Sequence, residues 1–325
     1  MKRYIRLSRP FTLLPPLLGI VSGAVCAFGS AHNPDPARRI TWAVVLTVAI
    51  GSLCASAMNA ASNIVNQIAD LEIDRRNKPG RPLVTGEIAV SRAWRVAAAL
   101  YVLAIAPTWL VVPYPYTSFS ERLRAPALLH AAFFIYCVGA LTTFVYSFPA
   151  LGRSKRHWLA ANLTIAVTRG GLLKVAGWSF VASVGVWEAW AIGGVFALFL
   201  LGATSTKDFS DMEGDRAHGC VSLPIRFGVE RAARIIAPFF VVPWLLIPFF
   251  AWLPDPAHST ARLLTGDRAF LTALGLVLAA WGAYAARLLL KDPEELARTE
   301  NHPAWTHMYL LMMTAQAGFA LGYVL

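Results

Sequence analysis

The sequence predicts an all-α, polytopic membrane protein with about nine transmembrane helices. Of its 325 residues, 57% are hydrophobic and only 14% are charged, whereas a soluble domain carries about a quarter charged residues. Apolar runs of about 20 residues, the length that crosses a bilayer as a helix, recur along the chain. Helix is expected in each run because lipid offers no hydrogen-bond partner to open backbone groups.

Nine apolar runs meet this description, and loops separate them. They lie near Phe11–Phe28, Ile40–Asn63, Ala93–Val112, Ala125–Tyr146, Trp158–Val181, Trp187–Ser205, Ile235–Leu253, Phe270–Leu289 and Trp305–Leu325. No hydrophilic stretch between them is long enough to fold as a soluble domain. Residues 1–325 are therefore expected to form one membrane domain.

The formal charge of +11 is unevenly distributed along the chain. With the loops assigned alternately to the two sides of a membrane, one side receives 21 of the 29 Lys and Arg residues and the other side six. This distribution is typical of membrane topology rather than of nucleic-acid binding. By the positive-inside rule, the N-terminus is expected in the cytoplasm and the C-terminus outside.

The first of two polar motifs ends the second apolar run. Asn66, Asp70 and Asp74 are spaced four residues apart, so on a helix they share one face, with Asn63 one turn earlier. Carboxylates stacked in this way repel each other, and a divalent cation would remove the repulsion. Carboxylate and amide oxygens suit Mg²⁺, which commonly shares its coordination shell with substrate phosphates.

The second polar motif follows the sixth apolar run. Asp208, Asp211 and Asp215 are expected on one face of a helix, and Glu213 on another. The two motifs together hold seven of the 18 acidic residues, at the mouths of two membrane helices. Ionisable groups are costly at such a position and indicate function.

Either motif alone could be a solvated helix end whose charges form surface ion pairs. Two such motifs, both rich in Asp at helical spacing and both on the predicted cytoplasmic side, favour a shared metal site instead. A diphosphate held by that metal would still need cations on its other oxygens. The basic residues beside the motifs that could supply them are Lys78, Arg81, Lys207 and Arg216.

Two further cations, Arg169 and Lys174, lie inside the fifth apolar run. A charge within a membrane segment is expected to face a partner or a polar cavity. The alternative is that the long side chain extends to the membrane interface. Both residues are therefore candidates for contact with the diphosphate.

Further short motifs agree with the two Asp motifs. They are Arg9-Pro10, Asn77-Lys78-Pro79, Arg81-Pro82, Tyr146-Ser147 with Pro149, Lys155, and Lys207-Asp208 with Gly214-Asp215. With these residues the chain resembles the UbiA superfamily of membrane prenyltransferases over nearly its whole length. Both Asp motifs, in this order and among nine helices, make the resemblance specific.

The resemblance implies nine helices around a central cavity with a cytoplasmic cap that carries the Asp motifs. It implies that the aspartates and Asn66 bind Mg²⁺ and an isoprenyl diphosphate, with Lys155 and Arg169 as further diphosphate contacts. Metal and cations would stabilise the diphosphate that leaves when the allylic C–O bond breaks. A dry chamber with aromatic side chains would protect the allylic cation, and Tyr146 is the first candidate for such a ring.

The acceptor of the prenyl group is open between several classes. The first motif is similar to the homogentisate prenyltransferase branch, which favours a quinone-type aromatic acceptor. The second motif is similar to chlorophyll synthases and to geranylgeranylglyceryl phosphate transferases, so a tetrapyrrole or a lipid alcohol are alternatives. From other classes, a membrane transporter or a non-catalytic lipid-binding scaffold are the rivals. The transporter is disfavoured because the charges gather at one membrane face.

Overall fold

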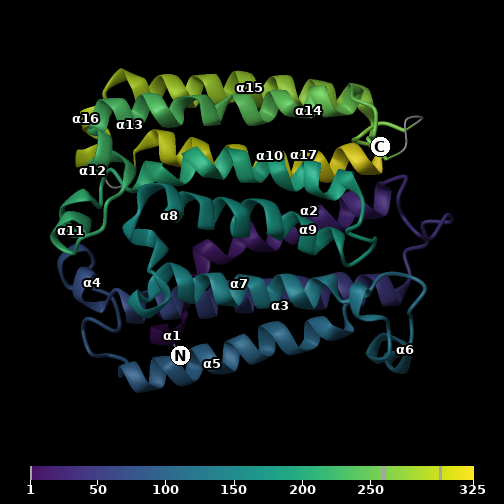
Figure 1. The fold of residues 1–325 in the computed structure, drawn as a ribbon, viewed down its shortest axis with the longest axis horizontal. Coiled ribbons are helices and arrows are strands. Elements are labelled where there is room, and N and C mark those ends of the chain that lie inside the picture. The colour runs from purple at the N-terminus through teal and green to yellow at the C-terminus, as the bar shows by residue number, and fades with distance from the viewer. Residues whose placement is uncertain (1, 258–260, 300–301) are drawn as a thin grey trace.

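The computed structural model describes residues 2–257, 261–299 and 302–325, which form an all-helical bundle (Figure 1). Within these ranges there are no β-strands beyond two isolated backbone bridges. The all-α prediction is therefore confirmed. The long helices lie side by side along one common direction, with short helices and loops at both ends of the bundle.

The helices that run along the bundle overlap the predicted apolar runs, although α13 lies mostly before the run predicted at Ile235–Leu253. They are α2 (Leu14–Gly29), α3 (Trp42–Ala69), α5 (Val90–Ile105), α7 (Ala131–Ser147), α8 (Trp158–Ile165), α9 (Leu173–Trp178), α10 (Trp187–Ala203), α13 (Val229–Ile236), α14 (Val242–Trp252), α15 (Arg268–Lys291) and α17 (Pro303–Val324). The shorter helices are α1 (Lys2–Ser8), α4 (Leu71–Asn77), α6 (Phe119–Leu123), α11 (Met212–Ala217), α12 (Leu223–Phe227) and α16 (Pro293–Arg298).

Six helical segments in the described part of the chain are long and apolar enough to cross a membrane. They are Pro10–Gly29, Trp42–Ala69, Val90–Leu110, Trp187–Lys207, Val229–Trp252 and Arg268–Lys291. The other three predicted runs are also helical, but α7 has only 17 residues, α8 and α9 are separate short helices, and α17 is less apolar. The count of nine transmembrane helices stays a prediction.

The fifth apolar run is not a regular α-helix. A π-helix at Ala166–Leu172 joins α8 to α9. Its wider turn adds a residue relative to an α-helix and rotates the side chains that follow, and such segments occur often at functional sites. Here the π-helix carries Thr168 and Arg169.

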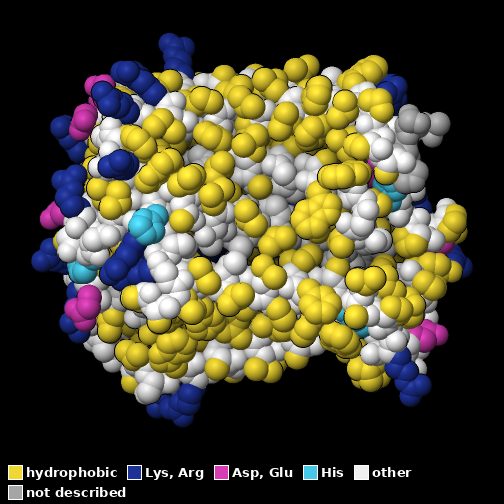
Figure 2. All heavy atoms as spheres, viewed as in Figure 1, with side chains coloured by type: hydrophobic (Ala, Val, Ile, Leu, Met, Phe, Trp, Pro, Cys, Tyr) yellow, Lys and Arg dark blue, Asp and Glu magenta, His cyan; other side chains and the backbone are white. Residues whose placement is uncertain are grey.

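The surface supports the membrane assignment. On the face shown in Figure 2, hydrophobic side chains cover a broad middle band, and most Lys, Arg, Asp and Glu side chains lie at the two ends. Large apolar side chains such as Leu53, Val102 and Leu276 are more than half exposed. Apolar exposure on this scale matches a surface that faces lipid. The protein is therefore an integral membrane protein.

Close helix packing in the centre of the bundle depends on small residues. A side chain at Gly177 of α9 would lie 2.2 Å from the carbonyl oxygen of Ile20 in α2, and one at Gly23 would lie 2.5 Å from the carbonyl oxygen of Lys174. The two helices therefore approach through their glycines. In lipid, such van der Waals contact between backbones replaces the hydrophobic effect as the force that holds helices together.

The two polar loops meet at one end of the bundle. Residues after α3 form α4, residues after α10 form α11, and these two short helices contact each other. Figure 1 places α4, α11, α12 and α16 at the same end, at the left of the view. The helices thus bring two motifs that are more than a hundred residues apart in sequence to one place.

Candidate functional site: a charged cavity at one end of the bundle

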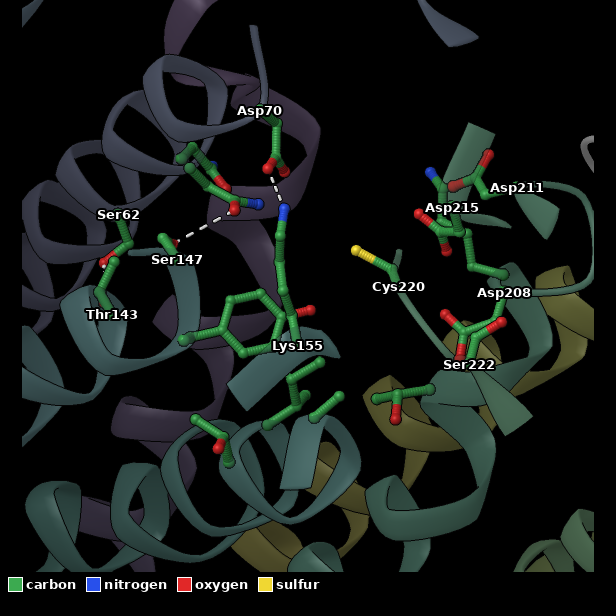
Figure 3. Close-up of a pocket in the computed structure, with 18 of the residues that line it drawn as sticks. Ser62, Asp70, Thr143, Ser147, Lys155, Asp208, Asp211, Asp215, Cys220 and Ser222 are labelled. Atoms are coloured by element: carbon green, nitrogen blue, oxygen red, sulfur yellow. Dashed lines mark hydrogen bonds and ion pairs between the residues drawn. The ribbon is translucent and has the colours of Figure 1, made fainter. Parts of the chain in front are cut away.

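A cavity of about 320 Å³ lies where the two polar loops meet the ends of α3, α7 and α8. Thirteen of the fifteen predicted site residues line it: Asn63, Asn66, Asp70, Asp74, Lys78, Arg81, Tyr146, Lys155, Arg169, Lys207, Asp208, Asp211 and Asp215. Figure 3 shows Asp70 on one side of this cavity and Asp208, Asp211 and Asp215 on the other. The side chain of Lys155 points toward Asp70 between them.

The first motif keeps the predicted face although its helix is interrupted. Helix α3 ends at Ala69, and Asp70 takes a non-helical conformation with φ −103° and ψ 13° before α4 begins. The backbone hydrogen bonds nevertheless continue at helical spacing, from the Asp70 amide to the Asn66 carbonyl (2.9 Å) and from the Asp74 amide to the Asp70 carbonyl (2.8 Å). Asn66, Asp70 and Asp74 therefore all face the cavity.

The second motif does not form the single helix that the spacing predicts. A 3₁₀-helix (Thr204–Lys207) ends the preceding span, a turn follows, and α11 begins only at Met212. The Asp208 amide bonds to the carbonyl of Ser205 (3.0 Å), three residues back, which tightens the last turn as helix ends commonly do. Asp208, Asp211 and Asp215 reach the cavity despite this correction, and Glu213 is exposed outside it.

Cations hold the carboxylates at the cavity. The Lys155 ammonium contacts Asp70, and the Arg153 guanidinium lies 3.3 Å from the same carboxylate. Arg81 contacts Asp74 in the same way. These pairs neutralise the first motif with residues from two different loops. Since the side chains of Lys155 and Arg153 are nearly buried, the pairs are screened little by solvent.

Burial and mutual repulsion change the acidity of the carboxylates. Burial, and then the neighbouring Asp211, raise the pKa of Asp215 to about 6. Burial raises the pKa of Asp208 well above its usual range, with Asp215 and Asp211 adding to the effect. Burial also raises the pKa of Asp74, and Arg81 opposes that shift. Crowded carboxylates of this kind gain most from an added cation.

The cavity cations are affected by burial as well. Burial lowers the pKa of Lys155 to about 8. Burial, and then the charge of Arg81, lower the pKa of Arg9 to about 10. A buried cation whose charge is not fully balanced by neighbouring carboxylates favours the binding of an anionic ligand.

Hydrogen bonds between polar side chains hold the side of the cavity that the first motif forms. The Asn63 amide donates to the Ser8 carbonyl (3.0 Å) and to the Thr12 hydroxyl (2.8 Å), which ties α3 to the N-terminal segment. The Ser147 hydroxyl donates to the Asn66 amide oxygen (3.3 Å), as the dashed line in Figure 3 shows. These contacts hold both asparagines in place.

Two predicted site residues do not reach the cavity. Lys174 is buried, and its ammonium lies 4.4 Å from the ring centroid of Phe196. No hydrogen-bond partner for that ammonium occurs in the described ranges, so it neither contacts the charged cavity nor extends to an interface. Arg216 is exposed on α11 and does not line the cavity. The rotation of α9 and of α11 about their axes decides whether Lys174 and Arg216 face the cavity. The spacing of residues in the sequence does not reveal that rotation.

The fold also brings to the site several residues that the sequence motifs did not indicate as site residues. Arg9, Asn162, Cys220 and Tyr309 line the cavity, and Arg153 pairs with Asp70. The Arg9-Pro10 pair at the start of an apolar run was a usable signal, since an arginine there is costly. Asn162 and Tyr309 come from apolar segments and Cys220 and Arg153 lie beside charged motifs, so only packing shows that these side chains reach the site.

A second and smaller pocket of about 110 Å³ adjoins the charged cavity. It lies between α2, α3, α7 and the π-helix, and its lining is mainly apolar. Four residues line both spaces: Ser62, Thr143, Thr168 and Arg169. The site thus combines a charged chamber with an apolar recess.

The fold combines helices that are long and apolar enough to span a membrane with a chamber, at one end, lined by five aspartates and several cations. Residues 16–311 match the UbiA prenyltransferase family, and the chain belongs to this family. Its activity class is therefore the transfer of prenyl groups within the membrane. The resemblance noted in the sequence is confirmed.

The curated proteins that are similar to this chain have names that refer to different products or acceptors. The chain is 28% identical to a probable homogentisate phytyltransferase 2 of Oryza sativa, covering 85% of this chain and 68% of that protein. It is 24% identical to a digeranylgeranylglyceryl phosphate synthase of Methanobrevibacter smithii, covering 76% and 77%. It is 25% identical to the bacteriochlorophyll synthase 34 kDa chain of Chloroflexus aurantiacus, covering 88% and 89%.

A solved structure has the same fold. A UbiA homologue of Archaeoglobus fulgidus bound to GPP and Mg²⁺ superposes with a TM-score of 0.65 at 20% identity, covering 98% of this chain and 99% of that one. At this identity the similarity establishes the fold alone.

Proposed function

We propose that this protein transfers a polyprenyl group from an isoprenyl diphosphate to a quinone-type aromatic ring and that the reaction depends on Mg²⁺. The observation that carries the proposal is the cavity itself. Five aspartates from two distant loops face one chamber that also contains Lys78, Arg81 and Lys155. Such a chamber suits a diphosphate held by both metal and basic side chains.

The donor set fits Mg²⁺. In the described ranges, no group of three or more His, Cys, Asp or Glu side chains is placed to enclose a metal ion by itself. Mg²⁺ usually takes only one or two protein carboxylates and completes its shell with water and substrate phosphates. We assign Asn66, Asp70 and Asp74 to one such ion.

We assign the other ion to the second motif, in which one or two of the carboxylates of Asp208, Asp211 and Asp215 would bind it directly and the rest through water. Bound Mg²⁺ would supply charge stabilisation for the leaving diphosphate. The carboxylates orient the donor, and the crowding that raises the pKa of Asp208 and Asp215 is relieved when cations arrive.

The protein's own residues then govern the transfer. The allylic C–O bond breaks, and its electron pair leaves with the diphosphate, to which Lys155, Lys78 and Arg81 donate hydrogen bonds. The acceptor ring carbon forms the new C–C bond, and the released diphosphate takes the ring proton. Tyr146 and the apolar chamber wall exclude water as a competing nucleophile.

The placement in the membrane completes the proposal. Nine transmembrane helices, including α7, α17 and the interrupted α8–α9 segment, surround the cavity. The excess of basic residues in the loops at the cavity end supports a cytoplasmic location for this cap and for the N-terminus. The donor and a lipid or small acceptor would reach the site from the membrane and the cytoplasm.

Two other acceptors are the alternatives: a lipid alcohol such as a glycerol phosphate, and a tetrapyrrole. The similarity to a digeranylgeranylglyceryl phosphate synthase supports the lipid alcohol, and the similarity to a bacteriochlorophyll synthase chain supports the tetrapyrrole. The acceptor panel in the experiment below separates the three classes.

The test is prenyl transfer by purified protein in detergent, with geranylgeranyl diphosphate, an acceptor panel, and either Mg²⁺ or EDTA. Wild type is compared with Asp70→Ala and Asp208→Ala. The proposal expects a Mg²⁺-dependent product on an aromatic acceptor that both variants lose. Equal donor binding in all three proteins with no diphosphate released would contradict it.

A further inference from the structure

The short helix α1 and the start of α5 form one surface at the cavity end of the bundle, toward the left of Figure 1. Leu7 of α1, Ile88 and Ala93 belong to a single buried hydrophobic cluster, so the two segments pack together. The Arg6 guanidinium lies 3.2 Å from the Glu87 carboxylate, which fixes α1 to the loop that leads into α5. The side chains on the outside of this surface therefore have a defined arrangement.

The exposed side chains of this surface are mainly basic. We call them the α1–α5 patch: Lys2, Arg3, Arg6, Arg92 and Arg95. The nearby carboxylate of Glu87 is already paired with Arg6, and the first turn of α5 contains no acidic residue. In the described part of the chain, no carboxylate lies within 4.0 Å of the other four cations. The patch therefore carries an excess of positive charge.

The start of α5 lies at the depth of the lipid headgroups. Val90–Leu110 is long and apolar enough to cross a membrane, and Arg92 and Arg95 lie near its beginning. Trp94 between them is 36% exposed, and its ring stacks on Phe148 with centroids 5.8 Å apart. Trp at the end of a membrane span is typical of the boundary between headgroups and hydrocarbon. Both arginines are therefore placed beside membrane phosphates.

Helix α1 fits the same boundary. The Gln67 side-chain amide donates to the Leu7 carbonyl (2.7 Å), which holds α1 against the cavity end of α3. Ile5, which lies between Arg3 and Arg6 in the sequence, is 49% exposed. An exposed apolar side chain beside cations suits a membrane interface, where the apolar group enters the acyl region and the cations meet phosphates.

We propose that the α1–α5 patch binds the headgroups of anionic phospholipids in the leaflet at the cavity end. Guanidinium groups donate paired hydrogen bonds to phosphate oxygens, and a cluster of basic residues next to a membrane span attracts an anionic leaflet. The exposed Ile5 and Trp94 add apolar contact that a lipid provides and a soluble phosphate does not. None of the five basic residues lines the charged cavity, so this site is separate from the donor site.

The experiment compares charge-matched variants of the purified full chain in detergent. Arg92→Gln with Arg95→Gln removes two cations of the patch. The control, Arg231→Gln with Arg298→Gln, removes two exposed cations from α13 and α16, which contact each other and also carry acidic residues. Titrations followed by native mass spectrometry measure the affinities for phosphatidylglycerol and for zwitterionic phosphatidylcholine.

Wild type should bind phosphatidylglycerol more tightly than phosphatidylcholine. Each cation near an anionic leaflet contributes about fivefold to affinity, so the Arg92/Arg95 variant should bind phosphatidylglycerol about 25-fold more weakly. Its affinity for phosphatidylcholine should stay within about twofold, and the control should lose less than about threefold for either lipid. Lys2→Gln with Arg3→Gln should repeat the loss, which tests the patch from the other helix.

Three results would overturn the lipid site. Equal losses in the patch variants and the control would mean that lipid preference follows the net charge of this end of the bundle. Displacement of phosphatidylglycerol by millimolar glycerol 1-phosphate would mean that the patch takes a soluble phosphate. Weaker binding of geranyl thiodiphosphate and Mg²⁺ to the Arg92/Arg95 variant, measured by calorimetry, would place these arginines in the donor site.

Discussion

The Lys78 ammonium lies 3.9 Å from a carboxylate oxygen of Asp211, so a cation that follows the first polar motif contacts the second. The contact crosses the junction of α4 and α11, the two short helices that meet at the end of the bundle. It ties the two loops together at the point where the diphosphate is proposed to bind.

Replacing Lys78 with Met should weaken donor binding about tenfold. The variant removes one cation from the chamber, so the negative charge of Asp211 loses a nearby positive charge. Loss of a single charge-assisted contact weakens binding about tenfold. Calorimetric titration with geranyl thiodiphosphate and Mg²⁺ measures the effect. Lys291→Met, on an exposed residue at the end of α15, is the control and should bind normally. Identical affinities in both variants would remove Lys78 from the site.

Lys155→Ala should have a larger effect than its neighbour Arg156→Ala. Lys155 lines the cavity and contacts Asp70, whereas Arg156 is exposed and outside the lining. Loss of the buried ammonium should reduce donor affinity by ten- to a hundredfold, and Arg156→Ala should change it less than twofold. A steady-state titration of donor concentration checks both. If Arg156→Ala were the more damaging change, the assignment of the cavity would be wrong.

Removal of divalent metal should abolish donor binding, not merely turnover. The aspartates repel a diphosphate unless cations intervene, so EDTA should lower donor affinity by at least a hundredfold. Calorimetry with EDTA, and then with Mg²⁺ restored, measures the change. Asp208→Asn should reduce the Mg²⁺ dependence because it removes one charge while keeping the shape. Full donor affinity in EDTA would show that basic residues alone bind the diphosphate.

Gly177→Leu should destabilise the bundle. The added side chain would overlap the Ile20 backbone of α2, where even a Cβ atom would lie 2.2 Å from the carbonyl oxygen. Overpacking of a tight contact costs about 1–3 kcal/mol, which should lower Tm by several degrees. Gly194→Leu, which meets nothing within 4 Å, is the control. Thermal unfolding in detergent distinguishes them, and equal Tm values would contradict the packing argument.

Glu188→Ala should destabilise the protein without affecting the donor site. The buried Glu188 carboxylate accepts hydrogen bonds from the Ser30 hydroxyl (2.5 Å), the Thr265 amide (2.5 Å) and the Tyr323 hydroxyl. Its removal leaves these donors unsatisfied, each at a cost of about 1–3 kcal/mol. Thermal unfolding should show a lower Tm for Glu188→Ala and a smaller loss for Glu188→Gln. A change in donor affinity would mean that the network reaches the chamber.

The helical architecture and the aspartates of the charged chamber were predictable from the sequence. Helix follows from apolar runs in lipid, and the two Asp motifs follow even-numbered runs, so both fall at the same membrane face. The spacing of Asn66, Asp70 and Asp74 placed them on one face, and the structure keeps them there. The continuous helix expected for Asp208–Asp215 was wrong, because a 3₁₀ turn and a bend carry the chain to α11.

The tertiary structure alone decided which cations enter the chamber and where the apolar recess lies. Arg9 and Arg153 reach the site, and Lys174 and Arg216 do not. These outcomes depend on how far each helix is rotated and on which helices pack together. Hydrophobic pattern and residue spacing are local properties of the chain. The recess between α2, α3, α7 and the π-helix combines residues from Pro16 to Ala176, and only packing brings them into one pocket.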